Sequence, residues 1–297
     1  MKLKKIARDI FDFVLFIKVK ALFCLLAPFS IHFINKLADL LGWLGFYAAF
    51  PRRRTALRNL DIAFGDTKTK EEKRKIAIES FQNLVKGIFE LNYYYVRGAA
   101  EMNRRFSYEG FENYTGALRK GPVLFISAHL GQFALMVCKF VADGQDVYLI
   151  LKEVANRYLE RMFNVYRRKI TGTGKLYSIL IYYKPRFLSL KRSLRELRRG
   201  HSLFIFVDQK FSRGVKTRFF GREILAPPGA DTLARKSGAT VLPAFIVRKG
   251  TKHKIIIGKP LDISGDENEN TRKFNEQVEM FVRKYPGQWW WFHKKWR

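Results

Sequence analysis

One histidine of this chain stands where a general base could work. His129 follows the apolar run Val123–Ser127, which has the pattern of a buried β-strand, and it precedes Gly131. Open α/β sheets bind their ligands at the carboxyl ends of the strands, so a side chain at this point faces a ligand site. A neutral imidazole there can take a proton from a hydroxyl at physiological pH. The alternative is a structural histidine that caps the following helix.

The remaining histidines and the cysteines indicate no second centre. Cys24 and Cys138 lie in apolar runs, with neither the spacing of metal ligands nor a disulfide pattern. A G-x-G-x-x-G fingerprint is absent as well. We therefore expect no metal, no cofactor and reduced thiols in a protein that faces the cytosol. Four further histidines stand in settings that predict no chemistry: His32, His201, His253 and His293.

The sequence pattern around His129 predicts strands that alternate with helices. Strands are expected at Val123–Ser127, Val147–Leu151, Leu203–Val207, Thr240–Val247 and Lys254–Ile257. Helical patterns occupy Gln132–Phe140, Asn156–Tyr166, Leu188–Arg199, Asp231–Ser237 and Thr271–Lys284, and the first hundred residues are helical throughout. This alternation predicts an α/β fold, with a single domain at residues 51–297 built on a largely parallel sheet.

The first 50 residues form a separate segment. Its apolar stretch is interrupted by charged residues, and the charge-free run Ala21–Ile31 contains Pro28, whereas a spanning helix needs about 20 apolar residues. No cleavage site of a signal peptide follows. We expect two membrane-associated helices, Ile6–Ala27 and Ile31–Ala49, whose lysines contact anionic head groups of the cytoplasmic leaflet. The alternative is an ordinary buried helical hairpin.

The composition is both basic and apolar. The chain has 297 residues, 56 Lys and Arg against 26 Asp and Glu, a net charge of +30, and 47% hydrophobic residues. Such a surface suits an anionic membrane surface, an acidic protein or nucleic acid, or it is simply a solvated basic face. Because no RNA- or DNA-binding module is recognisable, we expect no nucleic acid partner.

Several sequence blocks, taken in order along the chain, carry a resemblance to a known family. The block around His129 is Ser127-Ala128-His129-Leu130-Gly131-Gln132-Phe133. The others are Arg58-Asn59-Leu60 with Ala63-Phe64, Asp208-Gln209 followed by Phe219-Phe220-Gly221, Pro228-Gly229 with Leu233-Ala234, Gly238-Ala239 with Pro243, and the Trp-rich ending from Pro286 to Trp296. Together these blocks, from Arg52 to the C-terminus, resemble the lipid A biosynthesis (late) lauroyl/myristoyl acyltransferases, members of the wider group with a His-x4-Asp/Glu signature.

The resemblance implies an acyltransferase of lipopolysaccharide biosynthesis. Such an enzyme moves a fatty acyl group from acyl carrier protein to a hydroxyl of a membrane glycolipid of the lipid A precursor type, with His129 as general base. It would work at the cytoplasmic face of the inner membrane and needs no cofactor. An acyl-CoA donor with another glycolipid acceptor is an alternative.

Position 134 departs from the family pattern. Four residues after His129 the family has Glu or Asp, which orients the imidazole, and this chain has Ala134. Loss of the orienting acid of a His–carboxylate pair can cost on the order of 10⁴ in rate, as in serine proteases. We therefore expect an inactivated form, in which restoring Glu would raise the rate at least about 10²-fold. Asp208 lies on another strand and is not expected to substitute. A catalytically dead lipid-binding or scaffolding protein is the alternative.

The resemblance also implies substrate contacts, at Gly131, Lys152, Arg167, Arg168, Asp208 and Gln209. Lys152 follows a strand where the family often has a basic residue, and Gly172 is in register for Arg168. Cations there would hold phosphates of the acceptor or of the carrier's phosphopantetheine arm, unless they are a solvated helix end. Asp208 would organise these cations or the floor of the site.

The Trp-rich ending has two interpretations. Tryptophans interleaved with lysines are typical of an aromatic belt at a membrane interface. The alternative is an apolar plug that fills the core.

Overall fold

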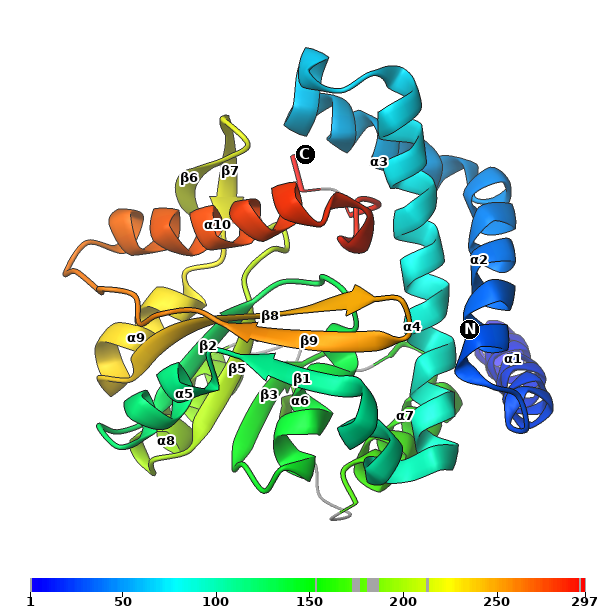
Figure 1. Ribbon diagram of the computed structural model, residues 1–297, viewed down its shortest axis with the longest axis horizontal. Coiled ribbons are helices and arrows are strands. Elements are labelled where there is room, and N and C mark those ends of the chain that lie inside the picture. Colours follow the sequence, from blue (N-terminus) through cyan, green and yellow to red (C-terminus); the bar gives the residue numbers. More distant parts are fainter. Residues whose placement is uncertain are drawn as a thin grey trace.

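The computed structural model describes residues 2–152, 154–172, 177–180, 187–211, 214–293 and 295–296. The N-terminal third is helical, as the sequence predicts, in four helices: α1 (Lys2–Leu26), α2 (Ile31–Ala48), α3 (Phe50–Phe64) and α4 (Lys70–Arg105). A capping box starts α4, because Thr69 accepts from the backbone of Glu72 while the Glu72 carboxylate accepts from Thr69. Gly98, at φ 77°, kinks its last part. Figure 1 shows α4 as the long column beside which α2 lies.

Seven strands form the central sheet in the order β1-β9-β8-β2-β5-β3-β4. All neighbours pair in parallel except β8 and β9, so β9 and β1 run against the other five strands. The five predicted strands are confirmed: β2 (Val123–Ser127), β3 (Val147–Leu151), β5 (Ser202–Phe206), β8 (Thr240–Lys249) and β9 (Lys252–Ile257).

Four strands were missed by the sequence pattern: β1 (Phe106–Glu109), β4 (Tyr177–Leu180) and the separate hairpin of β6 (Val215–Phe219) with β7 (Arg222–Ala226). β1 is four residues long and follows α4 directly, so its apolar signal merges with that of the helix. β6 alternates buried and exposed residues, but its exposed positions are the basic Lys216 and Arg218. The turn of the hairpin holds Phe220 at φ 51°.

Helices cover both faces of the sheet. The remaining helices are α5 (Phe111–Leu118), α6 (Phe133–Ala142), α7 (Arg157–Ile170), α8 (Phe187–Arg198), α9 (Gly229–Ser237) and α10 (Glu267–Lys284). Alternate residues of β2 divide between two hydrophobic clusters. Leu124 and Ile126 join the cluster with α8, α9 and α10, while Val123 and Phe125 join the one with α5, α6 and α7. In Figure 1, α10 and α6 accordingly lie on opposite sides of β8 and β9.

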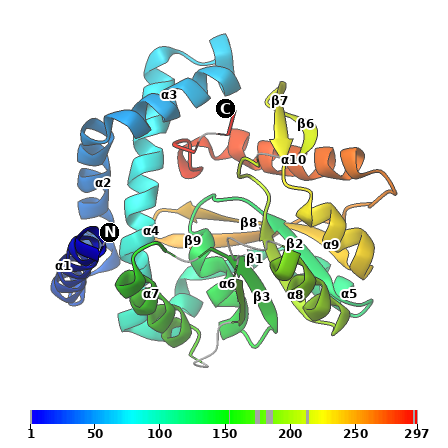
Figure 2. The same cartoon turned by 180° about the vertical axis from the view of Figure 1, so that it is seen from behind.

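The first two helices differ in how much of their surface the protein covers. α2 lies so close to α4 that a Cβ atom at Gly42 would come within 2.4 Å of the Gln82 backbone. Among the α1 residues whose burial is described, 6–26, only Phe23 and Leu26 are fully buried, near the end of the helix. Figure 2 shows both helices at one edge of the molecule. Within the described part of the chain, every helix is too short or too polar to cross a membrane.

Candidate active site

His129 and Asp208 meet because their strands are parallel neighbours. Ser127 at the end of β2 pairs with Phe206 at the end of β5, so the residues two positions further on emerge side by side. The Asp208 carboxylate lies 2.8 Å from His129 Nδ1 through Oδ1 and accepts from the His129 backbone N–H at 2.9 Å through Oδ2. Asp208, which was not expected to substitute for the missing acid, therefore lies within hydrogen-bonding distance of the His129 ring. Parallel pairing makes a residue on another strand a close neighbour.

The charges fix the roles of the two imidazole nitrogens. Burial raises the pKa of the Asp208 carboxyl, but the charge and hydrogen bonds of His129, with the charge of Lys295, lower this pKa well below its usual range. Asp208 is thus ionised and can only accept, so His129 Nδ1 carries a proton. In the neutral ring, Nε2 then keeps its lone pair, the atom that a general base uses. Gln209, one of the predicted substrate contacts, lies 3.3 Å from this nitrogen through its amide Nε2.

A cavity of about 600 Å³ opens at His129, and Ala134 lines it as well. Both positions follow from the sequence, since β2 ends just before His129 and α6 starts just before Ala134. Apolar side chains dominate the rest of the wall: Leu84, Ile88, Leu91, Phe133, Leu149, Ile150, Leu151, Val154, Phe163, Ile205, Phe206, Phe211 and Trp290. A site of this kind takes an apolar ligand and offers it a few polar groups.

Gly131 shapes the cavity wall between His129 and α6. Its φ of +59° belongs to the left-handed region, and a Cβ atom there would lie 2.2 Å from the carbonyl oxygen of Ile246. Its amide donates to the Gln288 carbonyl at 2.9 Å. Gln132, the next residue, donates at 2.8 Å to the buried carboxylate of Glu90, which Arg248 neutralises. No local pattern indicated this buried pair, whose members are 158 residues apart.

The predicted cations separate into two groups. Lys152 and Arg167 line the cavity, and Arg167 pairs with Glu160 at 3.0 Å. Arg168, favoured by its register with Gly172, is exposed and is not among the residues that line the cavity. Lys210 also lines the cavity and was missed, although it directly follows the Asp208-Gln209 block. The Asp208 carboxylate contacts His129 and Trp289, and of the two roles expected for it these contacts favour the floor of the site.

The Trp-rich ending packs into the core around the site. Trp289 and Trp291 are 1% and 0% exposed, so the aromatic-belt interpretation is wrong for them and the core-plug alternative is right. Trp290 lies 5.0 Å from the His129 ring and stacks on His293, whose ring is 5.9 Å from that of His129. His293 thus belongs to the site, contrary to expectation. Burial, then the proximity of His129, lowers the pKa of His293.

Asn59, from the Arg58-Asn59-Leu60 block, and Ser80 hold this ending in place. Asn59 of α3 donates from Nδ2 to the carbonyl oxygens of Trp291 at 2.7 Å and His293 at 2.5 Å. Ser80 of α4 donates to the carbonyl oxygen of Trp289 at 2.5 Å. The C-terminus accordingly lies beside α3 in both whole-molecule views (Figures 1 and 2). Blocks more than 200 residues apart in sequence therefore meet at one site.

Known proteins with similar sequences show which family this chain belongs to. Residues 2–297 match the family model of the bacterial lipid A biosynthesis acyltransferases. The chain is 24% identical over 271 residues to the lipid A biosynthesis acyltransferase of Haemophilus influenzae. The aligned region covers 89% of this chain and 81% of that protein. It is 24% identical over 249 residues to the lipid A biosynthesis myristoyltransferase of Escherichia coli, and 22% identical over 262 residues to the palmitoleoyltransferase of the same organism. These matches span 82% and 84% of this chain, and 74% and 80% of the two relatives. The chain belongs to the bacterial lipid A biosynthesis acyltransferase family and is an acyltransferase.

Proposed function

We propose that this protein transfers a fatty acyl group from acyl carrier protein to a hydroxyl of a lipid A precursor, with His129 as general base and Asp208 as its orienting carboxylate. One observation carries the proposal: the 2.8 Å contact between His129 Nδ1 and Asp208, with the ring at the wall of an apolar cavity of about 600 Å³. Two relatives are named for transfer of myristoyl and palmitoleoyl groups, and such chains match an apolar cavity.

The chemical step follows from the protonation state of the dyad. His129 Nε2 takes the proton of the acceptor hydroxyl while that oxygen attacks the thioester carbonyl. The tetrahedral intermediate collapses, the carbon–sulfur bond breaks, and the sulfur leaves with the proton that the imidazolium returns. Asp208 stays ionised throughout and stabilises the imidazolium. The products are an ester on the glycolipid and a free thiol on the carrier.

The expectation of inactivity rested on the loss of the carboxylate at position 134. Asp208 already makes two hydrogen bonds to His129 and is 4% exposed, which is the arrangement that an orienting acid requires. We therefore propose that the chain is active as it stands. A scaffolding role without catalysis becomes the second candidate.

The cations around the cavity support a phosphate-bearing donor. Lys152, Arg167 and Lys210 line its wall, and guanidinium and ammonium groups bind phosphate. A phosphopantetheine arm on acyl carrier protein carries such a phosphate, and so does coenzyme A. The net charge of +30 favours the carrier, since a basic surface attracts an acidic protein as a whole in addition to the phosphate of its arm, whereas coenzyme A offers only its own phosphates.

The uncovered face of α1 and α2 supports docking on the cytoplasmic leaflet of the inner membrane. Large apolar side chains that other proteins would bury are exposed there, among them Phe11 at 66%, Ile10 at 59% and Trp43 at 43%. Lys18 and Lys20 lie among them on α1 and are exposed. Helices with this mixture lie in the head-group region and bind anionic lipid.

A reconstituted transfer assay tests the function. The purified protein is mixed with a lipid A precursor in anionic vesicles. The acyl donor is the thioester of either acyl carrier protein or coenzyme A, and the acylated product is measured by mass spectrometry. We expect transfer from the carrier, and a loss of at least about 10²-fold on His129→Ala. Equal transfer by His129→Ala would overturn His129 as base, equal use of both thioesters would overturn the preference for the carrier, and no transfer at all would favour the scaffold.

A further inference from the structure

The Asp208 carboxylate is held from behind by an indole. Trp289 Nε1 donates to Asp208 Oδ2 at 2.9 Å, the oxygen that also accepts from the His129 backbone N–H. Two donors therefore occupy Oδ2, and Oδ1 is left for the imidazole. A carboxylate bound in this way cannot rotate without breaking two hydrogen bonds, one of them to a fixed backbone group.

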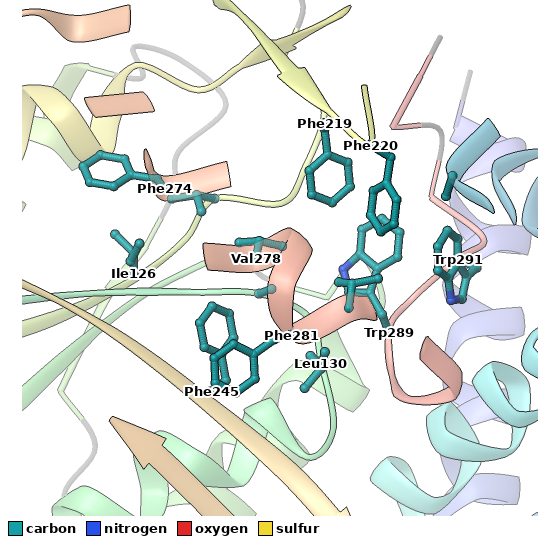
Figure 3. Packing of buried hydrophobic residues seen from close by; sticks show 14 of the residues in the cluster. Ile126, Leu130, Phe219, Phe220, Phe245, Phe274, Val278, Phe281, Trp289 and Trp291 are labelled. Carbon is teal, nitrogen blue, oxygen red and sulfur yellow. The ribbon is translucent and has the colours of Figure 1, made fainter. Parts of the chain in front are cut away.

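The indole itself is fixed by its surroundings. Trp289 is 1% exposed, its ring centroid lies 5.7 Å from that of Phe219 and 4.7 Å from that of Trp291, and Ser80 donates to its carbonyl oxygen. Figure 3 shows Phe219 and Phe220 descending from the β6–β7 hairpin onto the tryptophans. Leu130, next to His129 in the chain, forms a backbone bridge with Trp289. The ring thus has one orientation, in which its N–H points at Asp208.

We propose that Trp289 is a positioning residue, whose indole N–H fixes Asp208 so that His129 is held with Nε2 toward the cavity. This inference rests on the proposed function of the His129–Asp208 pair. Trp289 is not among the residues that line the cavity and so has no direct access to substrate there. Its effect on catalysis passes through Asp208.

The fold supplies a matched control in Trp291. This second tryptophan belongs to the same aromatic cluster and is 0% exposed, but its indole N–H donates to the Pro286 carbonyl oxygen at 2.7 Å. Trp289→Phe and Trp291→Phe therefore each remove one buried indole N–H and part of one buried ring. Only the first removes a donor from Asp208.

The two variants are compared by the pH dependence of kcat and KM. We expect Trp289→Phe to lower kcat roughly 10- to 100-fold with little change in KM, by analogy with the loss of a hydrogen-bond partner that orients a metal-ligating side chain. With less of its charge neutralised, Asp208 stabilises the imidazolium more strongly, so the acid limb of kcat/KM moves to higher pH. The ionisable groups around the pair, His293 and Lys295, are retained in both variants, and Trp291→Phe leaves the acid limb in place.

The low-field NMR signal of the proton between His129 Nδ1 and Asp208 gives a readout independent of activity. The chemical shift of this proton should change in Trp289→Phe and remain unchanged in Trp291→Phe. If Trp289→Phe fails to fold, benzothienylalanine at position 289 keeps the bicyclic shape and replaces N–H by sulfur. Equal kinetics of the two variants, or an unmoved proton signal on loss of the indole N–H, would overturn the inference. Activity that survives His129→Ala would instead overturn the proposed function, while the proton signal still tests Trp289.

Discussion

Two regions could present a carboxylate to His129, and the chain brings them there by different routes. The start of α6 is reached within five residues of His129, and Ala134 stands there. Asp208 follows the end of β5, 79 residues away from His129 in sequence, and binds both the ring and the backbone of His129. A spacing motif and a pair of parallel strands are thus alternative ways to place a carboxylate beside the same histidine. A gap in the first does not imply that the group is missing.

The largest effect in this comparison is expected at Asp208. Asp208→Asn should lower kcat on the order of 10⁴-fold and change KM little, because the variant keeps the shape but no longer holds the required tautomer. Steady-state kinetics of transfer measure both constants. Asp231→Asn is the control, since Asp231 is a fully buried carboxylate that pairs with Arg235 away from the site. A loss of similar size in both variants would mean that Asp208 acts through stability alone.

The loop at Gly131 joins His129 to the first of these regions, the start of α6. Gly131→Ala should lower the free energy of unfolding by about 1–3 kcal/mol, because alanine resists the left-handed conformation and its Cβ would collide with the Ile246 carbonyl. Gly116 in α5 has open space at its Cβ, so Gly116→Ala should be neutral or stabilising by up to about 1 kcal/mol. Denaturant unfolding of both variants measures the difference. Equal stability of the two would contradict the geometry of the loop.

Lys295 is a buried lysine close enough to Asp208 for their charges to interact, and it makes the stability of the protein depend on pH. Burial lowers the pKa of Lys295 to about 8, against 10.5 when unfolded. The unfolded chain therefore binds the proton more tightly, and this group makes stability rise with pH between about 8 and 10.5. Lys295→Met should remove that rise and stabilise the protein at pH 7 by about 3 kcal/mol, the free energy that corresponds to the lowered pKa. Unfolding curves at pH 7 and pH 10 check it, and an unchanged pH slope in the variant would contradict the assignment.

The sequence predicts most of the elements that surround His129. The strand before His129 and the helix after it were predicted because apolar runs and helical periodicity are local patterns, and five strands of the sheet were found in this way. The resemblance then singled out Asp208-Gln209 and the Trp-rich ending. What the sequence could not show was which strands are neighbours. The sheet order places β5 beside β2, while β3 and β4 lie beyond it, and only that order brings Asp208 to His129.

The role of the Trp-rich ending was hidden for the same reason. Tryptophan has the same pattern in a membrane belt and in a core, since both use its apolar ring and its single donor. The partners decide between them, and these are remote: Asn59 and Ser80 for the backbone, Asp208 for the indole of Trp289. Lys210 and His293 were passed over because neither residue has a local pattern that marks it.

The smallest effect, and the most direct test of the account, is expected at position 134. Ala134→Glu is assayed for acyl transfer beside the unaltered protein and beside Asp208→Asn, with the same lipid A precursor and carrier thioester. Because Asp208 already occupies His129 Nδ1, we expect Ala134→Glu to change kcat less than about tenfold, whereas a working general base contributes at least about 10²-fold. A gain of 10²-fold or more on this scale would contradict the account and show that the carboxylate missing from α6 is the one that His129 needs.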